Sequence, residues 1–168
     1  EAILQPDGSG RVSPALAPVT PALEPAFDVE VVVGRPEDLG ATRAGHRRIV
    51  PILGGALGGG LVGEILAGGA DWQLLRDDGA IEIDCRYSAR LVDGSLLYLQ
   101  VSGVRSGSPG VLEALLRGEH VDPQEYYFRT AVRVETSAPH LAHLQDAVLV
   151  ASCVRTADRV RYVAYRLT

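Results

Sequence analysis

Apolar and polar residues alternate with a period of two through residues 80–91, the clearest element of the chain. This period is typical of a β-strand with one buried face and one polar face. The apolar face carries Ile81, Ile83, Cys85, Tyr87, Ala89 and Leu91, and the polar face carries Glu82, Asp84, Arg86, Ser88 and Arg90. Residues 126–135 alternate in the same way, so both segments are predicted to be strands.

Shorter strand-like runs follow one another along the rest of the chain. They cover residues 27–33, 48–53, 61–66, 72–76, 96–104, 147–154 and 160–167. Asp77-Asp78-Gly79 and Asp93-Gly94 are hairpin turn signals. The glycine-rich residues 54–60 predict either a bulged strand or a wide turn, and the Gly- and Arg-rich stretch after residue 33 predicts a loop. One helix is expected at residues 111–117, between Pro109 and Gly118.

This pattern predicts an all-β chain of about eight or nine short strands with one short helix. Near-even spacing and short turns favour an antiparallel barrel or sandwich, and we expect a single barrel of the calycin or lipocalin type. Residues 1–26 carry five of the ten prolines and no periodic pattern, so they are expected to be an extended or disordered tail. The barrel domain is expected to span residues 27–168.

Composition and charge exclude several function classes. The chain has 168 residues and a net charge of −5, which disfavours nucleic acid as a partner. All 16 basic residues are arginine, so lysine-based Schiff-base and P-loop chemistry is excluded. No apolar run reaches the length of a membrane span, so no membrane partner is expected. The two cysteines form no CxxC pair, and the N-terminus has no signal-peptide pattern, which together indicate a cytoplasmic protein.

Several motifs in a fixed order resemble a known bacterial and fungal family, domain of unknown function 3237. They are Arg47-Arg48-Ile49-Val50-Pro51, Gly68-Gly69-Ala70-Asp71-Trp72-Gln73, Asp84-Cys85-Arg86-Tyr87, Asp93-Gly94, Tyr126-Tyr127-Phe128-Arg129-Thr130 and Glu135-Thr136. The resemblance covers residues 27–167. It implies a small antiparallel β-barrel that self-associates, and small organic substrates of natural-product or aromatic metabolism.

The resemblance also points to site residues. The family's recurrent positions match Asp71, Trp72, Asp84, Arg86, Tyr127, Arg129 and Glu135 in this chain. Because a recurring charged face in a small barrel favours a lined cavity, we expect the charged faces of residues 80–91 and 126–135 to point inward. The chain departs from the family after residue 136, where His143 stands in place of a tryptophan.

Each candidate has a chemical role and a structural alternative. Asp84 and Glu135 are candidates for a proton-transferring carboxylate pair, and Arg86 and Arg129 for binding a carboxylate or enolate oxygen. The same four residues also fit a cross-strand ladder of ion pairs. His143 is a candidate acid or base, or an ordinary loop residue.

The remaining candidates, Asp71, Trp72, Tyr98 and Tyr127, are expected to bind the substrate rather than to react. Tyr98 and Tyr127 are candidate hydrogen-bond donors to a ligand oxygen, and Trp72 is either a stacking surface or a core anchor. No compact set of metal ligands and no nucleotide-binding motif occurs, so neither a metal nor another cofactor is expected.

The function predicted from these residues is a cofactor-independent enzyme that isomerises or cyclises a largely apolar small molecule inside the barrel. Arg86 and Arg129 would stabilise developing negative charge, while Glu135, Asp84 or His143 moves the proton. The alternative is a lipocalin-like protein that binds a small molecule without chemistry. A third possibility is a structural homo-oligomer whose charged face is an interface.

Overall fold

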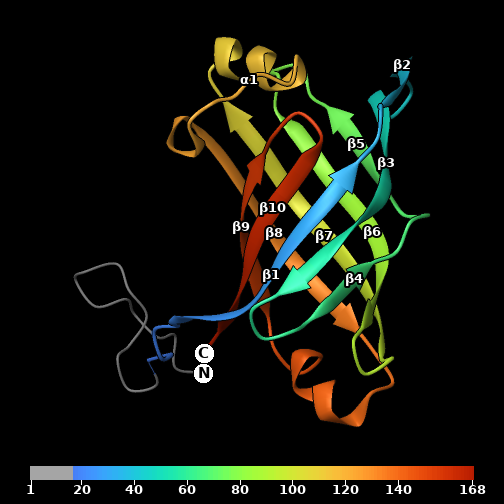
Figure 1. The fold of residues 1–168 in the computed structure, drawn as a ribbon. Helices are drawn as coiled ribbons and strands as arrows, with labels where there is room; N and C mark the ends of the chain where they lie inside the picture. Colours follow the sequence, from blue (N-terminus) through green and yellow to red (C-terminus); the bar gives the residue numbers. More distant parts are fainter. Residues whose placement is uncertain (1–16) are drawn as a thin grey trace, which may run out of the picture.

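Ten strands form one antiparallel sheet in the computed structural model, which describes residues 17–168 (Figure 1). The strands are β1 (Leu23–Val33), β2 (Glu37–Thr42), β3 (Gly45–Gly58), β4 (Gly63–Ile65), β5 (Ala70–Leu75), β6 (Ile81–Leu91), β7 (Leu96–Gly107), β8 (Tyr126–Glu135), β9 (Leu149–Arg155) and β10 (Arg159–Leu167). One α-helix, α1 (Pro109–Leu116), and two 3-10 helices, η2 (Pro123–Glu125) and η3 (Pro139–Leu144), lie between strands.

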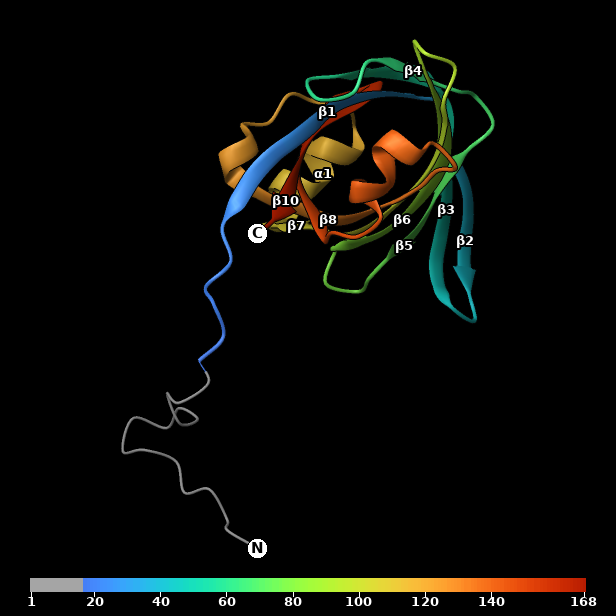
Figure 2. The ribbon, with the colours of Figure 1, turned by 90° about the horizontal axis from the view of Figure 1, so that it is seen from below.

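The sheet closes into a barrel, which confirms the predicted fold class. Its strands follow the order β1, β10, β9, β8, β7, β6, and then β3, which pairs with β1 and completes the ring. β4 and β5 both lie between β3 and β6 and share one position, so the ring has eight positions. β2 pairs only with β3 and stands outside the ring (Figure 2).

Alternation along each strand places one set of side chains inside the barrel. The buried core contains the apolar face of β6 and the matching faces of the other strands. The apolar residues of β8 are likewise buried, while every second residue is exposed. The polar faces of residues 80–91 and 126–135 therefore point outward, and the expectation that they line the interior is wrong. The reason is that the larger apolar side chains occupy the enclosed space instead.

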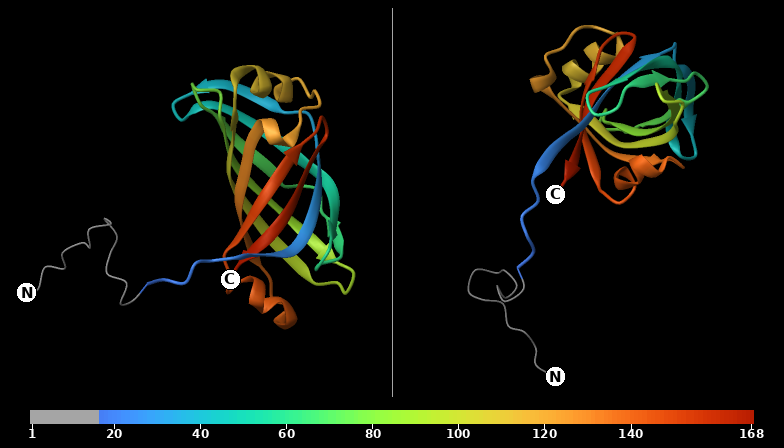
Figure 3. Two further views of the ribbon diagram at one scale, coloured as in Figure 1. Left: turned by 90° about the vertical axis from the view of Figure 1, so that its left-hand side faces the viewer. Right: turned by 60° about the horizontal axis from the view of Figure 1, so that its bottom comes forward.

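Two short helices lie at opposite ends of the barrel. α1 is at the upper end in Figure 1, and η3 is at the lower end. Figure 2, seen from below, shows η3 in front of the ring of strands, and the left view of Figure 3 shows it below the ring. η3 buries Leu141 and Leu144, and α1 buries Leu112 and Leu115. Within residues 17–168, no helix combines the length and apolar character needed to cross a membrane.

The bounds of most predicted elements differ from the observed ones by a few residues, and two differences change an assignment. β1 begins at Leu23, four residues inside the predicted tail, because this part of the chain pairs with the end of β10. The rest of that tail up to residue 16 lies outside the described residues. β2 replaces a predicted loop; its mostly exposed residues carry no alternating pattern, and backbone pairing with β3 holds it.

Glycine allows close approach of neighbouring strands at two points of the ring. A side chain at Gly55 of β3 would meet the carbonyl oxygen of Glu30 at 2.1 Å. The register of β1 and β3 shifts next to this glycine, between the pairs Val32–Gly54 and Val33–Ile52. Of the two forms predicted for the glycine-rich segment, the bulged strand is therefore the one observed. A side chain at Gly103 of β7 would meet the carbonyl oxygen of Arg129 at 2.1 Å.

We predict that Gly103→Ala lowers the free energy of unfolding by about 1–3 kcal/mol or more, because backbone of β8 must move to admit the methyl group. The matched control is Gly58→Ala in β3, where an added methyl group meets nothing within 4 Å. Its expected effect is within about 1 kcal/mol. Urea unfolding of both variants measures the difference, and equal stabilities would contradict the close-approach argument.

Candidate functional site

Polar side chains inside the barrel gather toward the end that carries α1. Asp71 and Gln73 of β5 and Arg105 of β7 are buried, with 8%, 6% and 3% of their surface exposed. Arg48 of β3 pairs across the sheet with Gln73, so it lies on the same inward face. Arg155, the last residue of β9, is half-buried beside them and lines the same cavity.

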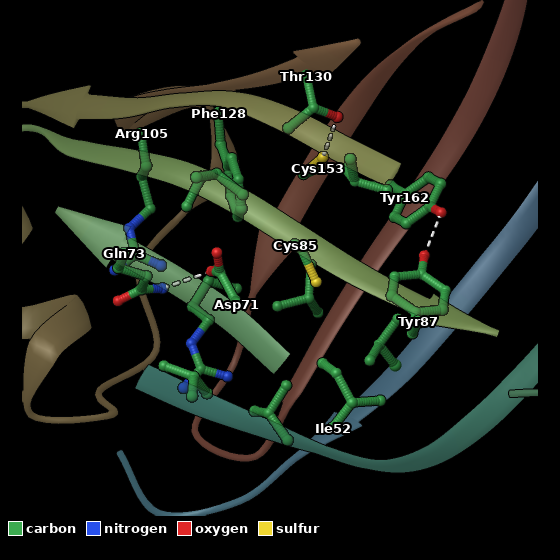
Figure 4. Close-up of a pocket in the computed structure, with 17 residues that line it drawn as sticks. Ile52, Asp71, Gln73, Cys85, Tyr87, Arg105, Phe128, Thr130, Cys153 and Tyr162 are labelled. Carbon is green, nitrogen blue, oxygen red and sulfur yellow. Dashed lines mark hydrogen bonds between the residues drawn. The ribbon is translucent and has the colours of Figure 1, made fainter. Parts of the chain in front are cut away.

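Asp71 lies at a break in the sheet, and hydrogen bonds at this break hold its side chain. The β5–β6 ladder is interrupted between the pairs Asp71–Cys85 and Leu74–Glu82. Across this break the Asp71 carboxylate accepts the backbone N–H of Asp84 at 3.0 Å, and it also accepts an N–H of Gln73 at 2.7 Å. The carboxyl group is therefore fixed in position on the barrel wall (Figure 4).

Burial dominates the acidity of Asp71. Loss of water raises the pKa of this carboxyl group to about 6, and the nearby Asp84 charge adds to the rise. The two hydrogen bonds and the positive charge of Arg105 act in the opposite direction. Asp71 therefore exchanges its proton close to neutral pH, which is the range that proton-transfer catalysis requires.

Arg105 is the most deeply buried charge of the described residues. Its guanidinium lies 5.5 Å from the centre of the Phe128 ring. Burial, followed by the charge of Arg155, lowers its pKa to about 10, so it stays positive at neutral pH. Among the described residues, no group pairs with Arg105 Nε or with Gln73 Oε1. Both atoms are buried.

Arg48, Arg105 and Arg155 form an arginine cluster of like charges. Burial and the charge of Arg48 lower the pKa of Arg155, and both Arg155 and Arg48 act on Arg105 in the same direction. Such mutual repulsion is relieved by a bound anion. Within residues 17–168, no group of three His, Cys, Asp or Glu side chains is arranged to hold a metal ion.

Arg105 and Arg155 of the arginine cluster border two adjoining spaces. An inner cavity of about 40 Å³ lies among the interior side chains of the barrel. A wider vestibule of about 330 Å³ lies beside the end of α1 and residues 34–36. Val33, Val50, Gln73, Arg105 and Arg155 border both spaces. The vestibule has the size of a small-molecule pocket, whereas the inner cavity has room for a few water molecules.

The deeper part of the inner cavity is less charged. Tyr87 of β6 and Tyr162 of β10 meet there through their hydroxyl groups, on the opposite side from Asp71 and Gln73 (Figure 4). The cysteines Cys85 and Cys153 also line this space, and burial raises the pKa of both thiols. They are therefore small buried side chains rather than thiolate nucleophiles.

Of the nine predicted site residues, the structure places only Asp71 inside the barrel. Asp84 and Arg86 form an ion pair of 3.2 Å on the outside of β6. Arg129 lies over the exposed ring of Tyr127, 5.4 Å from its centre. The roles predicted for these side chains stay predictions, but the face on which they lie is now fixed.

The other predicted residues also lie away from the interior. Tyr98 and Glu135 are cross-strand neighbours on the outside of β7 and β8. Trp72 is 37% exposed on the outer face of β5, so it is not a core anchor. His143 is exposed on η3, at the end opposite the arginine cluster.

Sequence reasoning missed Gln73, Arg105, Arg155 and Arg48. The sequence did contain a signal for Arg105 and Arg155. Each lies an even number of residues after the apolar residues of its strand, and therefore on the same face. Arg105 follows Leu97, Leu99, Val101 and Gly103 at steps of two, and Arg155 follows Leu149, Ala151 and Cys153. An arginine at the end of an apolar face is therefore the pattern that marks the mouth of this barrel.

Comparison with known proteins identifies relatives along nearly the whole barrel. The model of a family described as "Protein of unknown function (DUF3237)" matches residues 21–167. A UPF0311 protein of Rhodopseudomonas palustris is 40% identical over 145 residues, which cover 84% of this chain and 95% of that protein. A UPF0311 protein of Clostridium acetobutylicum is 33% identical over 147 residues, 86% of this chain and 93% of that protein.

Solved structures share the fold. A protein of unknown function from Rhodopseudomonas palustris has a TM-score of 0.84 at 36% identity, covering 91% of this chain and all of that chain. A β-barrel-like protein from Acinetobacter baumannii has a TM-score of 0.78 at 41% identity, covering 90% and 99%. A structure described as an enzyme from Penicillium herquei has a TM-score of 0.67 at 18% identity, covering 92% and 99%, which shows a common fold alone.

We predict that Asp71→Asn removes a pH dependence of stability. The folded wild type keeps the Asp71 proton up to about pH 6, while the unfolded chain releases it near 3.8, the ordinary pKa of an aspartate side chain. Wild-type stability therefore falls as pH rises through this window and stays lower above it. The asparagine amide carries no charge. Gln73 can still form a hydrogen bond with it if the amide group of Gln73 rotates.

The expected difference between variant and wild type grows with pH to about 3 kcal/mol in favour of Asp71→Asn. Urea unfolding at pH 4, 5, 6 and 7 measures it. The control is Asp77→Asn, the same substitution at an exposed turn. A difference that stays constant with pH for Asp71→Asn would show that burial does not destabilise the charged form of its carboxyl group.

Proposed function

The chain belongs to the DUF3237 family, and we propose that it is a cofactor-independent enzyme that moves a proton on a small organic anion at the mouth of its barrel. The observation that carries this proposal is the convergence of three arginines and one carboxyl group of raised pKa on the inner cavity and the adjoining vestibule. The ligand class is a carboxylate, or a carbonyl compound that forms an enolate.

The arginine cluster supports the choice of an anionic ligand. Three guanidinium groups face one nearby carboxyl group of the interior, Asp71, which is neutral whenever it holds its proton. Asp158 also borders the vestibule, and its charge acts on Arg155. Positive charge remains in excess, and guanidinium groups bind carboxylate and enolate oxygens through paired N–H donors.

Asp71 supplies the proton chemistry. As a carboxylate it removes a proton from a carbon beside the ligand's carbonyl group, and the C–H electron pair moves onto the oxygen. The arginine cluster stabilises the enolate that forms. Return of the proton to a different carbon completes an isomerisation, whereas attack of the enolate on a double bond of the same molecule, followed by protonation, completes a cyclisation.

A binding protein without chemistry is the second candidate. Two observations favour it: Asp71 is tied into the sheet by the N–H of Asp84, and the inner cavity is narrow. The Penicillium herquei protein of the same fold is described as an enzyme, which favours the first candidate. Self-association and a cytoplasmic location remain predictions of the sequence.

We predict that organic acids stabilise the wild type and Arg129→Gln but not Arg155→Gln. Arg129 is the matched control because it is one of the two exterior arginines that the sequence pattern selected. A thermal-shift screen of small aliphatic and aromatic carboxylates and phenols provides the ligand. At 100 times its dissociation constant, a ligand adds about 2.7 kcal/mol to wild-type stability. If Arg129→Gln loses the stabilisation and Arg155→Gln keeps it, the site lies on the outside.

Incubation of the stabilising compound in deuterium oxide separates the two candidate functions. Proton transfer at carbon incorporates deuterium, which NMR and mass spectrometry detect in the recovered compound. Asp71→Asn is expected to keep most of the affinity and to lose at least tenfold in exchange rate. A compound that binds through Arg155 and returns without deuterium or rearrangement identifies a binding protein.

A further inference from the structure

Tyr87 and Tyr162 are far apart in the chain, but their hydroxyl groups meet inside the barrel. They lie on β6 and β10, and 4% and 5% of their surfaces are exposed. The two oxygens are hydrogen-bonded to each other, and both side chains line the inner cavity (Figure 4). The reaction proposed above assigns no role to this tyrosine pair.

One hydroxyl hydrogen of the tyrosine pair has no hydrogen-bond acceptor within the part of the chain that the structure describes. Two phenol groups carry two O–H hydrogens, and a bond between them uses only one. Among the described residues, no other group accepts a hydrogen bond from either oxygen. A buried donor without an acceptor costs free energy, so the remaining O–H is available to an acceptor that enters the cavity.

Both phenol groups keep their hydrogens under physiological conditions. Burial raises the pKa of Tyr87 and of Tyr162 well above the ordinary value, so neither group becomes a phenolate. The wall near the tyrosine pair contains apolar side chains, the two thiols and Thr130, whose hydroxyl group is hydrogen-bonded to the Cys153 thiol. Thiols are weak hydrogen-bond partners. The acceptor that suits this place is a neutral oxygen such as that of a ketone.

Strand register gives the separation between the tyrosine pair and the charged end. Asp71 is level with Cys85 of β6, and Tyr87 lies two residues further along the same strand. On β9 and β10, Tyr162 is level with Cys153, and Arg155 lies two residues beyond. Two residues of strand span about 7 Å, so a short aliphatic chain reaches from one end to the other.

We infer that the tyrosine pair is a second anchor, which donates a hydrogen bond to a ketone oxygen of the ligand while the arginine cluster holds its carboxylate. The ligand class is therefore a slender oxo acid. This inference rests on the proposed function, because it uses the same anion site. The inner cavity of about 40 Å³ supports a slender ligand, since it has room for a group no larger than a few water molecules.

The test compares oxo acids with straight-chain acids of equal length. Levulinate and its longer oxo homologues are paired with valerate and its homologues, and calorimetry measures each affinity. We expect at least one oxo acid to bind the wild type about five- to tenfold more tightly than its partner, the ratio expected for one buried hydrogen bond.

The variant is Tyr87→Phe combined with Tyr162→Phe. Removing both hydroxyls leaves no orphaned donor and keeps both rings, so stability is expected to change little, as urea unfolding checks. The double variant is expected to lose the preference for oxo acids and to keep its affinity for straight-chain acids. Tyr127→Phe, on the exposed outer face, is the matched control and keeps the preference.

The outcomes separate this inference from the proposed function. Equal wild-type affinity for both members of every pair, or a preference that survives in the double variant, overturns the second anchor and leaves the anion site intact. Failure of every acid to bind, or equal binding by Arg155→Gln, overturns the anion site and the inference together.

Discussion

Closure of the sheet between β1 and β3 is the constraint on which the rest of this structure depends. A closed ring of eight positions encloses an interior, and every second residue of each strand must enter it. Water is largely excluded there, so each enclosed polar group needs a partner or raises the energy of the folded state. The interior is accordingly apolar along most of its length, and its few polar groups stand out as candidates for function.

The two ends of the ring meet this constraint differently. At one end, η3 covers the opening with Leu141 and Leu144. At the other end, the arginine cluster borders the inner cavity and the vestibule. Because strands rather than loops hold these arginines and Asp71, their geometry is set before a ligand arrives. Preorganised charge of this kind needs little rearrangement when an anion binds or forms.

The same rigidity limits what enters. The vestibule is wide, but the space behind Arg105 is narrow and ends at the tyrosine pair. In the proposed binding mode, the charged group of the ligand lies near the opening and a thin neutral group reaches the hydroxyls. Polarity thus changes along the cavity from charged to neutral, which gives the site a direction as well as a shape.

The amino-acid sequence by itself determined the strands and their faces. The period of two in residues 80–91 and 126–135 follows from backbone geometry, so the segments and their apolar faces were predicted correctly. The hairpin turns at Asp77-Asp78-Gly79 and Asp93-Gly94 and the single helix were also local features. β2 escaped prediction because its pairing with β3, and not its own pattern, holds it.

Only the tertiary structure decided which polar residues meet. Parity shows that Asp84 and Arg86 share a face, but it does not say whether water or a cavity lies beyond that face. Arg48, Asp71, Arg105 and Arg155 come from four strands that are distant in the chain, as do Tyr87 and Tyr162 from two others. Their proximity depends on the order and register of strands around the ring. That order is set by long-range pairing and packing of the whole core, which no local pattern of residues contains.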